Sequence, residues 1–176
     1  MSDHTSTAPF EQHFLTETQA YERLLPTLGL TGRSVAEFGA GRGELTRLLV
    51  KAGARVVAYE IDAGLSFDAG YPPDASLPIR ASGGGVELRI EDVAKADLSF
   101  LGPEWACASN PPYSILDLVL SALDAHGVRD ALLMVPAKRV PDLIQQGFKT
   151  AFELGGDAFH PPARGRHIVM IRGFRT

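Results

Sequence analysis

Two short motifs, far apart in the chain, carry the residue types that could bind a cofactor and direct a reaction. The first runs from Glu37 through Phe38 to three alternating glycines at positions 39, 41 and 43. The second is Asn110-Pro111-Pro112-Tyr113, in which a polar amide precedes two prolines and an aromatic ring. The first motif suits a bound cofactor, and the second suits an acceptor nitrogen that is held beside it.

The glycine motif is predicted to form a corner between a buried strand and a helix. The apolar residues before it end in Phe38 as a parallel strand, and apolar Leu45, Leu48 and Leu49 follow at helical spacing. Because glycine has no side chain, the backbone there can approach a ligand closely. The third glycine comes one residue earlier than in the G-x-G-x-x-G pattern of dinucleotide sites. A glycine corner without a ligand is the alternative, since glycine patterns alone are weak motifs.

Two acidic residues favour S-adenosylmethionine as the ligand of this corner. A second strand, expected over 55–60, ends in Glu60, which could accept hydrogen bonds from both hydroxyls of a ribose. Glu37 would place a negative charge near the turn, which repels a pyrophosphate and attracts the positive charge of a sulfonium amino acid.

The Asn110 motif is predicted to hold an exocyclic amino group. Residues 104–109 are expected to form the fourth parallel strand, which puts Asn110 at the edge where open α/β sheets bind ligands. The prolines restrict the backbone, so the carbonyls of Asn110 and Pro111 point in fixed directions and can accept hydrogen bonds from an NH2 group. Tyr113 could stack on the ring that carries the nitrogen. The alternative is a proline-rich strand exit with a capping Asn.

These two motifs and four further segments, at residues 12–15, 60–62, 90–93 and 159–162, resemble the catalytic domain of the ribosomal RNA adenine N6-methyltransferases. This is the family of the small-subunit adenine dimethylases and the macrolide-resistance methylases. The resemblance implies a class I S-adenosylmethionine-dependent methyltransferase that acts on adenine N6 in RNA. The residues that it assigns to the cofactor are Gln12, Phe14, Glu37, Gly39, Gly41, Gly43, Glu60, Ile61, Asp92, Val93 and Asn110. The residues that it assigns to catalysis are Asn110, Pro111, Tyr113 and Phe159, whose ring would stack on the target base.

The sequence departs from the family pattern at several positions. His13 replaces the usual Asn, and Ala163 stands where a second proline is expected after Phe159. Pro111 replaces Leu or Ile, which gives the N-P-P-Y form also seen in DNA adenine and protein glutamine methyltransferases. The acceptor could therefore also be DNA adenine, a glutamine amide or a small molecule. A binding module without turnover is a third hypothesis, against which the intact Asn110 motif argues.

Hydrophobic patterning predicts the elements that must position these residues. We expect helices over 16–28 (capped by Thr16), 43–52, 114–126 and 137–146, and strands over 34–38, 55–60, 86–91, 104–109, 129–135, 149–154 and 166–172. This alternation predicts a doubly wound, mostly parallel α/β sheet that ends in an antiparallel hairpin. Residues 63–85, rich in glycine and proline, interrupt the pattern and are expected to form a lid or a mobile segment.

Length and composition predict one compact domain, because 176 residues with 45% hydrophobic content suit a single core. The resemblance implies that this is the catalytic domain, over 1–176, without the helical C-terminal domain of the family. No apolar run reaches the roughly 20 residues of a membrane span, and residues 1–9 show no targeting pattern, so a soluble, cytoplasmic protein is expected. Cys107 is expected in the core, and no cluster of His and Cys indicates a metal.

The net charge of −4 is unfavourable for a domain that binds nucleic acid over its whole surface. The charge is uneven, with 9 basic and 17 acidic residues through residue 128 and 8 basic and 4 acidic residues from Arg129 onward. An RNA-facing basic edge could comprise Lys138, Arg139, Lys149, Arg164, Arg166, Arg172 and Arg175, although a solvated face is the alternative. A partner protein could replace the absent domain. His160 and His167 are expected to be packing or surface residues.

Overall fold

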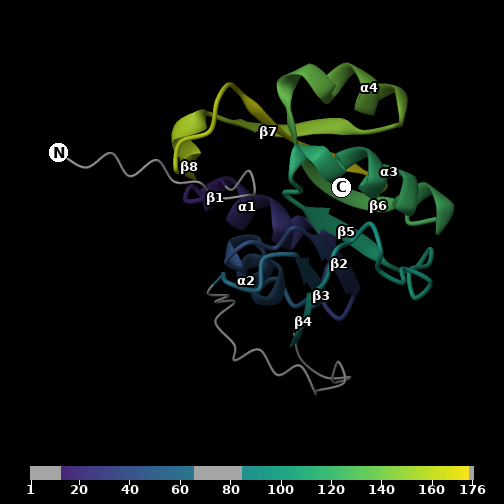
Figure 1. The fold of residues 1–176 in the computed structure, drawn as a ribbon. Helices are drawn as coiled ribbons and strands as arrows, with labels where there is room; N and C mark the ends of the chain where they lie inside the picture. The colour runs from purple at the N-terminus through teal and green to yellow at the C-terminus, as the bar shows by residue number, and fades with distance from the viewer. Residues whose placement is uncertain (1–12, 66–84, 175–176) are drawn as a thin grey trace.

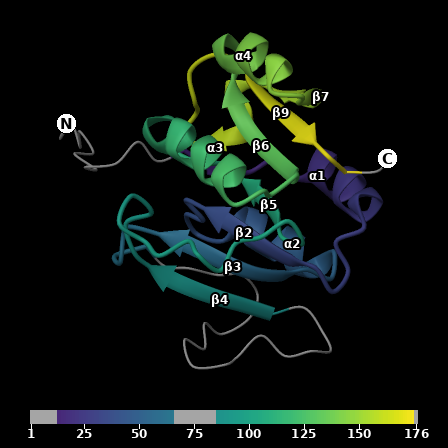
Figure 2. The same cartoon turned by 90° about the vertical axis from the view of Figure 1, so that its right-hand side faces the viewer.

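The computed structural model describes residues 13–65 and 85–174, and within them seven strands form one mixed sheet (Figures 1 and 2). The strand order is β4-β3-β2-β5-β6-β9-β7. The strands are β2 (Ser34–Phe38), β3 (Arg55–Glu60), β4 (Gly85–Ile90), β5 (Ala106–Ser109), β6 (Asp130–Pro136), β7 (Lys149–Leu154) and β9 (His167–Arg172). Strands β2 to β6 pair in parallel, and β9 is antiparallel to both β6 and β7. The predicted doubly wound sheet with an antiparallel end is confirmed.

Helices cover both faces of the sheet. The helices are α1 (Gln19–Leu24), α2 (Glu44–Lys51), α3 (Leu116–Ala125) and α4 (Val140–Gln145), with 3-10 turns at Leu25–Leu28, Tyr113–Ile115, Ala137–Arg139 and Gly156–Ala158. Along β3, Val56 and Ala58 pack in the cluster that holds α1 and α2, whereas Val57 and Tyr59 pack in the cluster that holds α3 and α4. Alternate residues of a strand therefore supply two separate cores, because successive side chains point to opposite faces.

The N-terminal helix begins later than expected, and Thr16 does not cap it. Helix α1 begins at Gln19 after Thr18, and no side chain caps it. The Thr16 N–H instead donates to the carbonyl of Ala158 at 2.8 Å. The cause is a two-stranded antiparallel sheet of β1 (Phe14–Leu15) and β8 (Phe159–His160), which the sequence analysis missed because each strand has only two residues.

The other predicted boundaries differ by a few residues. The helices expected over 114–126 and 137–146 each begin as a 3-10 turn, and residues 104–105 lie outside β5. Most of the stretch predicted as a lid, namely residues 66–84, lies outside the described residues.

Cys107 is buried in β5, and burial raises the pKa of its thiol to about 12, as expected of a core residue. Across the two described ranges, every helix is too short or too polar to cross a membrane.

The strand order changes direction between β2 and β5, and the carboxyl ends of these strands are joined by a side chain. The two strands pair only at Val35 with Ala106 and at Ala36 with Cys107. Beyond these pairs, the buried Oγ of Ser109 accepts a hydrogen bond from the N–H of Phe38 at 2.8 Å. The backbone ladder therefore ends at the point where open α/β sheets bind their ligands.

We expect Ser109→Ala to lower the free energy of unfolding by about 1–3 kcal/mol, because it leaves the buried Phe38 N–H without an acceptor. Ser121→Ala, on the exposed face of α3, is the matched control and should change stability by less than about 0.5 kcal/mol. Urea denaturation measures both values. Equal stability of the two variants would show that Ser109 does not close the ladder.

Candidate functional site

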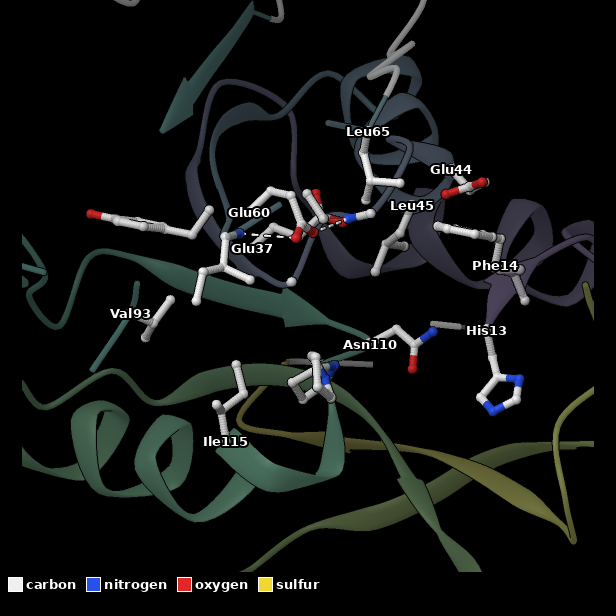
Figure 3. Close-up of a pocket in the computed structure, with 18 of the residues that line it drawn as sticks. His13, Phe14, Glu37, Glu44, Leu45, Glu60, Leu65, Val93, Asn110 and Ile115 are labelled. Carbon is white, nitrogen blue, oxygen red and sulfur yellow. Dashed lines mark hydrogen bonds between the residues drawn. The ribbon is translucent and has the colours of Figure 1, made fainter. Parts of the chain in front are cut away.

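A cavity of about 500 Å³ lies at the carboxyl edge of β2, β3 and β5. Figure 3 shows Glu37 and Glu60 on one side of it, Asn110 across from them, and Phe14 and Val93 toward opposite ends. Its volume is within the range of small-molecule sites. The predicted site residues that line it are Phe14, Glu37, Gly39, Gly41, Glu60, Ile61, Asp92, Val93, Asn110, Pro111, Tyr113 and Phe159. Gly43 instead precedes α2 as its N-cap, and Gln12 lies outside the described residues.

The two sequence motifs touch each other at Gly39. The three alternating glycines have φ values of 77°, 60° and 91°, a left-handed conformation that other residues rarely adopt. A Cβ added at Gly39 would lie 2.6 Å from Cδ of Pro112, so the proline ring occupies the space beside the glycine. The glycine turn therefore fixes the position of the Asn110 motif as well as its own backbone.

The Glu60 carboxylate ties the glycine turn to the end of β3. Its Oε2 accepts a hydrogen bond from the Gly41 N–H at 2.8 Å, and its Oε1 accepts from the N–H groups of Ile61 and Asp62 at 2.9 and 3.0 Å. A carboxylate has about four lone-pair sites, so three of them are occupied. Oε2, with one backbone donor, is the oxygen that is better able to accept a ligand hydroxyl. Acceptance of two ribose hydroxyls, as expected, would require one of the three backbone donors to give up its lone-pair site.

Glu37 is buried, with 1% of its surface exposed, and is protonated more readily than an ordinary carboxyl group. Burial raises its pKa to about 8, although Thr46 Oγ1 opposes this shift by donating a hydrogen bond to Oε2 at 2.6 Å. The nearby Glu44, which also lines the cavity, has its pKa raised chiefly by burial. The negative charge expected at Glu37 is therefore largely absent near pH 7 until a cation approaches the carboxyl group.

The acceptor side of the cavity combines Asn110 with two aromatic rings. Asn110 directly follows β5, as predicted, and Tyr113 is 37% exposed. Phe159 is only 4% exposed, so most of its ring is covered. His167 lies between the two rings, forms a hydrogen bond through Nδ1 with Tyr113 Oη, and has its ring centroid 4.8 Å from that of Phe159.

His167 is a packing residue, which agrees with the expectation of a packing or surface residue, but its place in the cavity wall was not predicted. It lines the cavity and is 3% exposed. No local motif could have identified it, because pairing of β9 with the end of β6 brings it to the site. The other lining residues that were not assigned are His13, Leu15, Ala40, Glu44, Leu45, Tyr59, Leu65, Glu91, Pro112, Ser114 and Ile115. Of these, Ala40 and Pro112 lie within the two motifs and Glu44 and Ser114 directly follow them, so these four could have been inferred from that position.

The N-terminal segment closes one end of the cavity. The Arg42 guanidinium lies 4.2 Å from the centroid of the Phe14 ring, and a Cβ at Gly41 would lie 3.5 Å from that ring. His13, which replaces the Asn of the family pattern, donates a hydrogen bond from Nδ1 to the carbonyl of Pro161 at 2.9 Å. This bond joins the N-terminal segment to the turn that follows Phe159.

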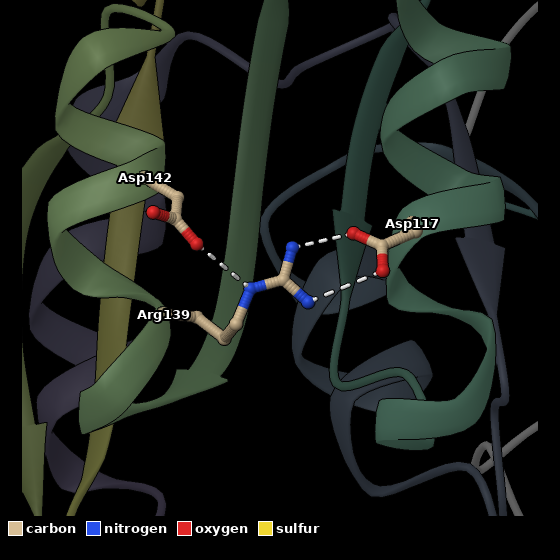
Figure 4. Close-up of polar contacts among 3 residues, drawn as sticks. All are labelled: Asp117, Arg139 and Asp142. Atoms are coloured by element: carbon tan, nitrogen blue, oxygen red, sulfur yellow. Dashed lines mark hydrogen bonds and ion pairs between the residues drawn. The ribbon is translucent and has the colours of Figure 1, made fainter.

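The predicted basic edge is divided in the structure. Lys149 and Arg172 lie at the opposite end of the sheet from the cavity, because they pair with or beside the first residues of β6. Arg139 is held by Asp117 of α3 and by Asp142 of α4 (Figure 4), and Arg166 pairs with Glu153 at 3.4 Å. The exposed Lys138 and Arg164 lie at the cavity end of the sheet, and Arg175 is outside the described residues.

Comparison with known protein families identifies relatives of this chain. A family model described as ribosomal RNA adenine dimethylase matches residues 4–154. The ribosomal RNA small subunit methyltransferase A of Thermotoga petrophila is 41% identical over 128 residues, which cover 70% of this chain and 45% of the relative. The probable ribosomal RNA small subunit methyltransferase A of Methanospirillum hungatei is 29% identical over 177 residues, which cover 91% and 66%. The chain spans about half the length of many curated relatives that it matches.

Solved structures share the fold. The 23S rRNA methyltransferase ErmE superposes with a TM-score of 0.69 at 20% identity, covering 93% of this chain and 70% of that chain. A dimethyladenosine transferase from Plasmodium falciparum superposes with a TM-score of 0.67 at 15% identity, covering 93% and 64%. These similarities confirm the expected class I methyltransferase fold.

The contact at Gly39 predicts different effects of alanine at two glycines. Gly39→Ala should cost about 1–2 kcal/mol for the left-handed backbone and a further 1–3 kcal/mol, roughly, for the clash with Pro112. Gly29→Ala is the matched control, because Gly29 has a φ of 63° and nothing within 4 Å of an added Cβ. Denaturation of Gly39→Ala, of Gly29→Ala and of a Gly39→Ala/Pro112→Ala double variant measures these costs. The contact would be disproved if the two single variants lost equal stability.

Glu37→Gln should stabilise the protein at alkaline pH. The folded-state pKa of Glu37 lies near 8 and the ordinary value is 4.5, so its contribution to stability is present below 4.5 and is lost as pH rises toward 8. Glutamine keeps an oxygen that can accept from Thr46 but has no proton to lose. At about pH 8.5 the melting temperature of the variant should therefore exceed that of the wild type by roughly 2–4 °C or more. At acidic pH the two melting temperatures should differ little. Glu104→Gln, at an exposed site, should show no such pH-dependent gain, and a parallel change in both variants would refute the role of burial.

Proposed function

Because the chain belongs to the ribosomal RNA adenine dimethylase family, we propose that it transfers methyl groups from S-adenosylmethionine to the exocyclic N6 of adenine in RNA. One observation carries the proposal. The glycine turn and the Asn110 motif contact each other at Gly39 and Pro112 and line the same cavity. A donor held by the first motif would therefore lie next to an acceptor held by the second.

The side chains on the β3 side of the cavity fit S-adenosylmethionine, which when bound supplies a methyl group on a positively charged sulfur. Glu60 Oε2 can accept a hydrogen bond from a ribose hydroxyl, and Asp92 can accept one from the adenine amino group of the cofactor. Ile61 and Val93 provide apolar surface for the adenine ring. Glu37 lies in the same cavity, and a cation beside it would favour its charged form.

Asn110 and Pro111 position the acceptor. The side-chain carbonyl of Asn110 and the main-chain carbonyl of Pro111 each accept one N–H of the target amino group, which leaves the nitrogen lone pair directed at the donor methyl. Tyr113 stacks on the base, and Phe159 forms part of the wall behind it. With S-adenosylmethionine bound, the two carbonyl acceptors would hold the nitrogen facing the methyl carbon, so that the methyl group could pass from sulfur to nitrogen and the proton from nitrogen to solvent. Most of the rate enhancement comes from positioning, and the base must be unstacked to enter.

RNA would approach over the exposed cavity end of the sheet. Lys138 and Arg164 are exposed there, whereas Arg139 and Arg166 are already engaged by acidic side chains. We therefore assign the phosphate contacts first to Lys138 and Arg164. Pro111 favours a second candidate acceptor, DNA adenine or a glutamine amide, because the N-P-P-Y form also occurs in DNA adenine and protein glutamine methyltransferases.

Incubation with methyl-labelled S-adenosylmethionine and separate RNA, DNA, protein and small-molecule fractions tests the proposal. Digestion of the labelled fraction then identifies the modified atom. The proposal requires label on N6 of adenine in RNA. Label confined to DNA or protein would replace the acceptor, and no label in any fraction would contradict methyl transfer altogether.

Glu60→Ala should weaken binding of S-adenosylmethionine by more than tenfold, since a charged hydrogen bond to a ribose hydroxyl contributes about 1.5–3 kcal/mol. Calorimetry measures the affinity, and thermal melting reports the separate cost of freeing three backbone donors. Glu104→Ala removes the same charge at an exposed site away from the cavity and should bind normally. Unchanged affinity of Glu60→Ala would remove Glu60 from the ribose site.

Asn110→Ala should leave cofactor affinity nearly unchanged and lower turnover by roughly two to three orders of magnitude, because the lost acceptor acts mainly in the transition state. Steady-state assays on the labelled substrate measure turnover. Ser121→Ala, on the outer face of α3, is the control and should retain full activity. An active Asn110→Ala variant would mean that the methyl group goes to an atom other than an amino or amide nitrogen.

A further inference from the structure

His167 joins the acceptor motif to the antiparallel end of the sheet. It is the first residue of β9 and lies opposite Pro136, the last residue of β6. Tyr113 follows β5, on the other side of β6 in the sheet. The hydrogen bond between His167 Nδ1 and Tyr113 Oη therefore reaches across the carboxyl end of β6.

The same imidazole contacts both aromatic rings of the acceptor side. It stacks on Tyr113 with ring centroids 5.9 Å apart and an interplanar angle of 20°. It meets the ring of Phe159 at 4.8 Å and 57°. Tyr113 is the exposed member of this group, and its contacts with His167 restrict the rotamers that its ring can adopt. Holding a side chain in its bound conformation before the ligand arrives lowers the entropy cost of binding.

A histidine is a costly choice for this position if packing were its only role. It is 3% exposed, and its buried Nε2 makes no well-aligned hydrogen bond among the described residues. A buried polar atom without a well-aligned partner destabilises the fold, so an aliphatic residue would pack at lower cost. Burial lowers the pKa of His167, against an opposing hydrogen bond with the backbone of Arg164, and so favours the neutral imidazole. In the tautomer that is protonated at Nε2, Nδ1 accepts the hydrogen bond from the Tyr113 hydroxyl.

We propose that His167 is a positioning residue for the acceptor: through its bond to Tyr113 and its contact with Phe159, it holds the two rings as one preformed wall for the target base. This inference rests on the proposed function, because the wall matters only if a planar acceptor enters the cavity. His167 itself does not touch the methyl group or the target nitrogen in this account.

Three variants test the inference in an enzyme that is active on RNA. His167→Leu removes the hydrogen bond and the ring and should raise the KM for RNA by roughly five- to tenfold with a smaller change in kcat. Its melting temperature and S-adenosylmethionine affinity should stay close to those of the wild type. In His167→Asn the amide oxygen can replace Nδ1 as the acceptor, so the KM for RNA should lie between those of the wild type and His167→Leu. His126→Leu, at the end of α3, is the matched control and should behave like the wild type.

Tyr113→Phe removes the other end of the hydrogen bond. Its KM should rise to a similar extent, and the His167→Leu/Tyr113→Phe double variant should be little worse than either single variant, because both remove the same contact. Unchanged KM in His167→Leu, or effects of His167→Leu and Tyr113→Phe that multiply in the double variant, would overturn the assignment.

An imidazole ¹⁵N spectrum gives a readout that does not depend on activity. The Nδ1 resonance of His167 should be that of an unprotonated nitrogen that accepts a hydrogen bond, and it should shift in Tyr113→Phe. A protonated Nδ1, or no shift in that variant, would overturn the inference. Absence of methyl transfer by the wild type would instead overturn the proposed function, so the two failures are distinguishable.

Discussion

The contact between Pro112 and Gly39 is the constraint on which the rest of the site depends. Strands β2 and β5 share only two residue pairs, so their carboxyl ends are not held together by a backbone ladder. The proline ring fills the space beside the glycine and sets how closely the two strand ends approach. Glu60 fixes the other side of the same turn through the Gly41 N–H. The glycine turn is thus held by Pro112 on one side and by Glu60 on the other, and all three line the cavity.

The site concentrates polar groups that the fold only partly satisfies. Glu60 accepts hydrogen bonds from three backbone N–H groups, whereas the buried Glu37 accepts one from the Thr46 side chain, and burial raises the pKa of Glu37. His167 likewise leaves one ring nitrogen without a well-aligned hydrogen bond among the described residues. Such groups lower the stability of the free protein. Their place around one cavity agrees with the general tendency of functional sites to carry locally unfavourable residues.

Sequence patterns were most informative where chemistry and local geometry coincide. Asn110 and the glycines were predicted correctly as strand-end residues, because the proline pair and the alternating glycines restrict the backbone locally. Ser109 and His167 acquire their roles only when distant strands pair, so no local pattern could reveal them. The β1–β8 sheet was missed for the same reason, since its strands are too short to show periodicity. Arg139 was predicted to face RNA, but Asp117 and Asp142 come to it from two helices.

We propose that one cavity holds a methyl donor at the glycine turn and an amino acceptor at the adjoining Asn110 motif. A crystal structure with bound S-adenosylmethionine tests it most directly. We expect a ribose hydroxyl on Glu60, the cofactor adenine between Ile61 and Val93, and the sulfonium methyl group facing the side-chain carbonyl of Asn110. A cofactor bound away from the carboxyl edge of β2 and β3, or one whose methyl group faces away from Asn110, would contradict it.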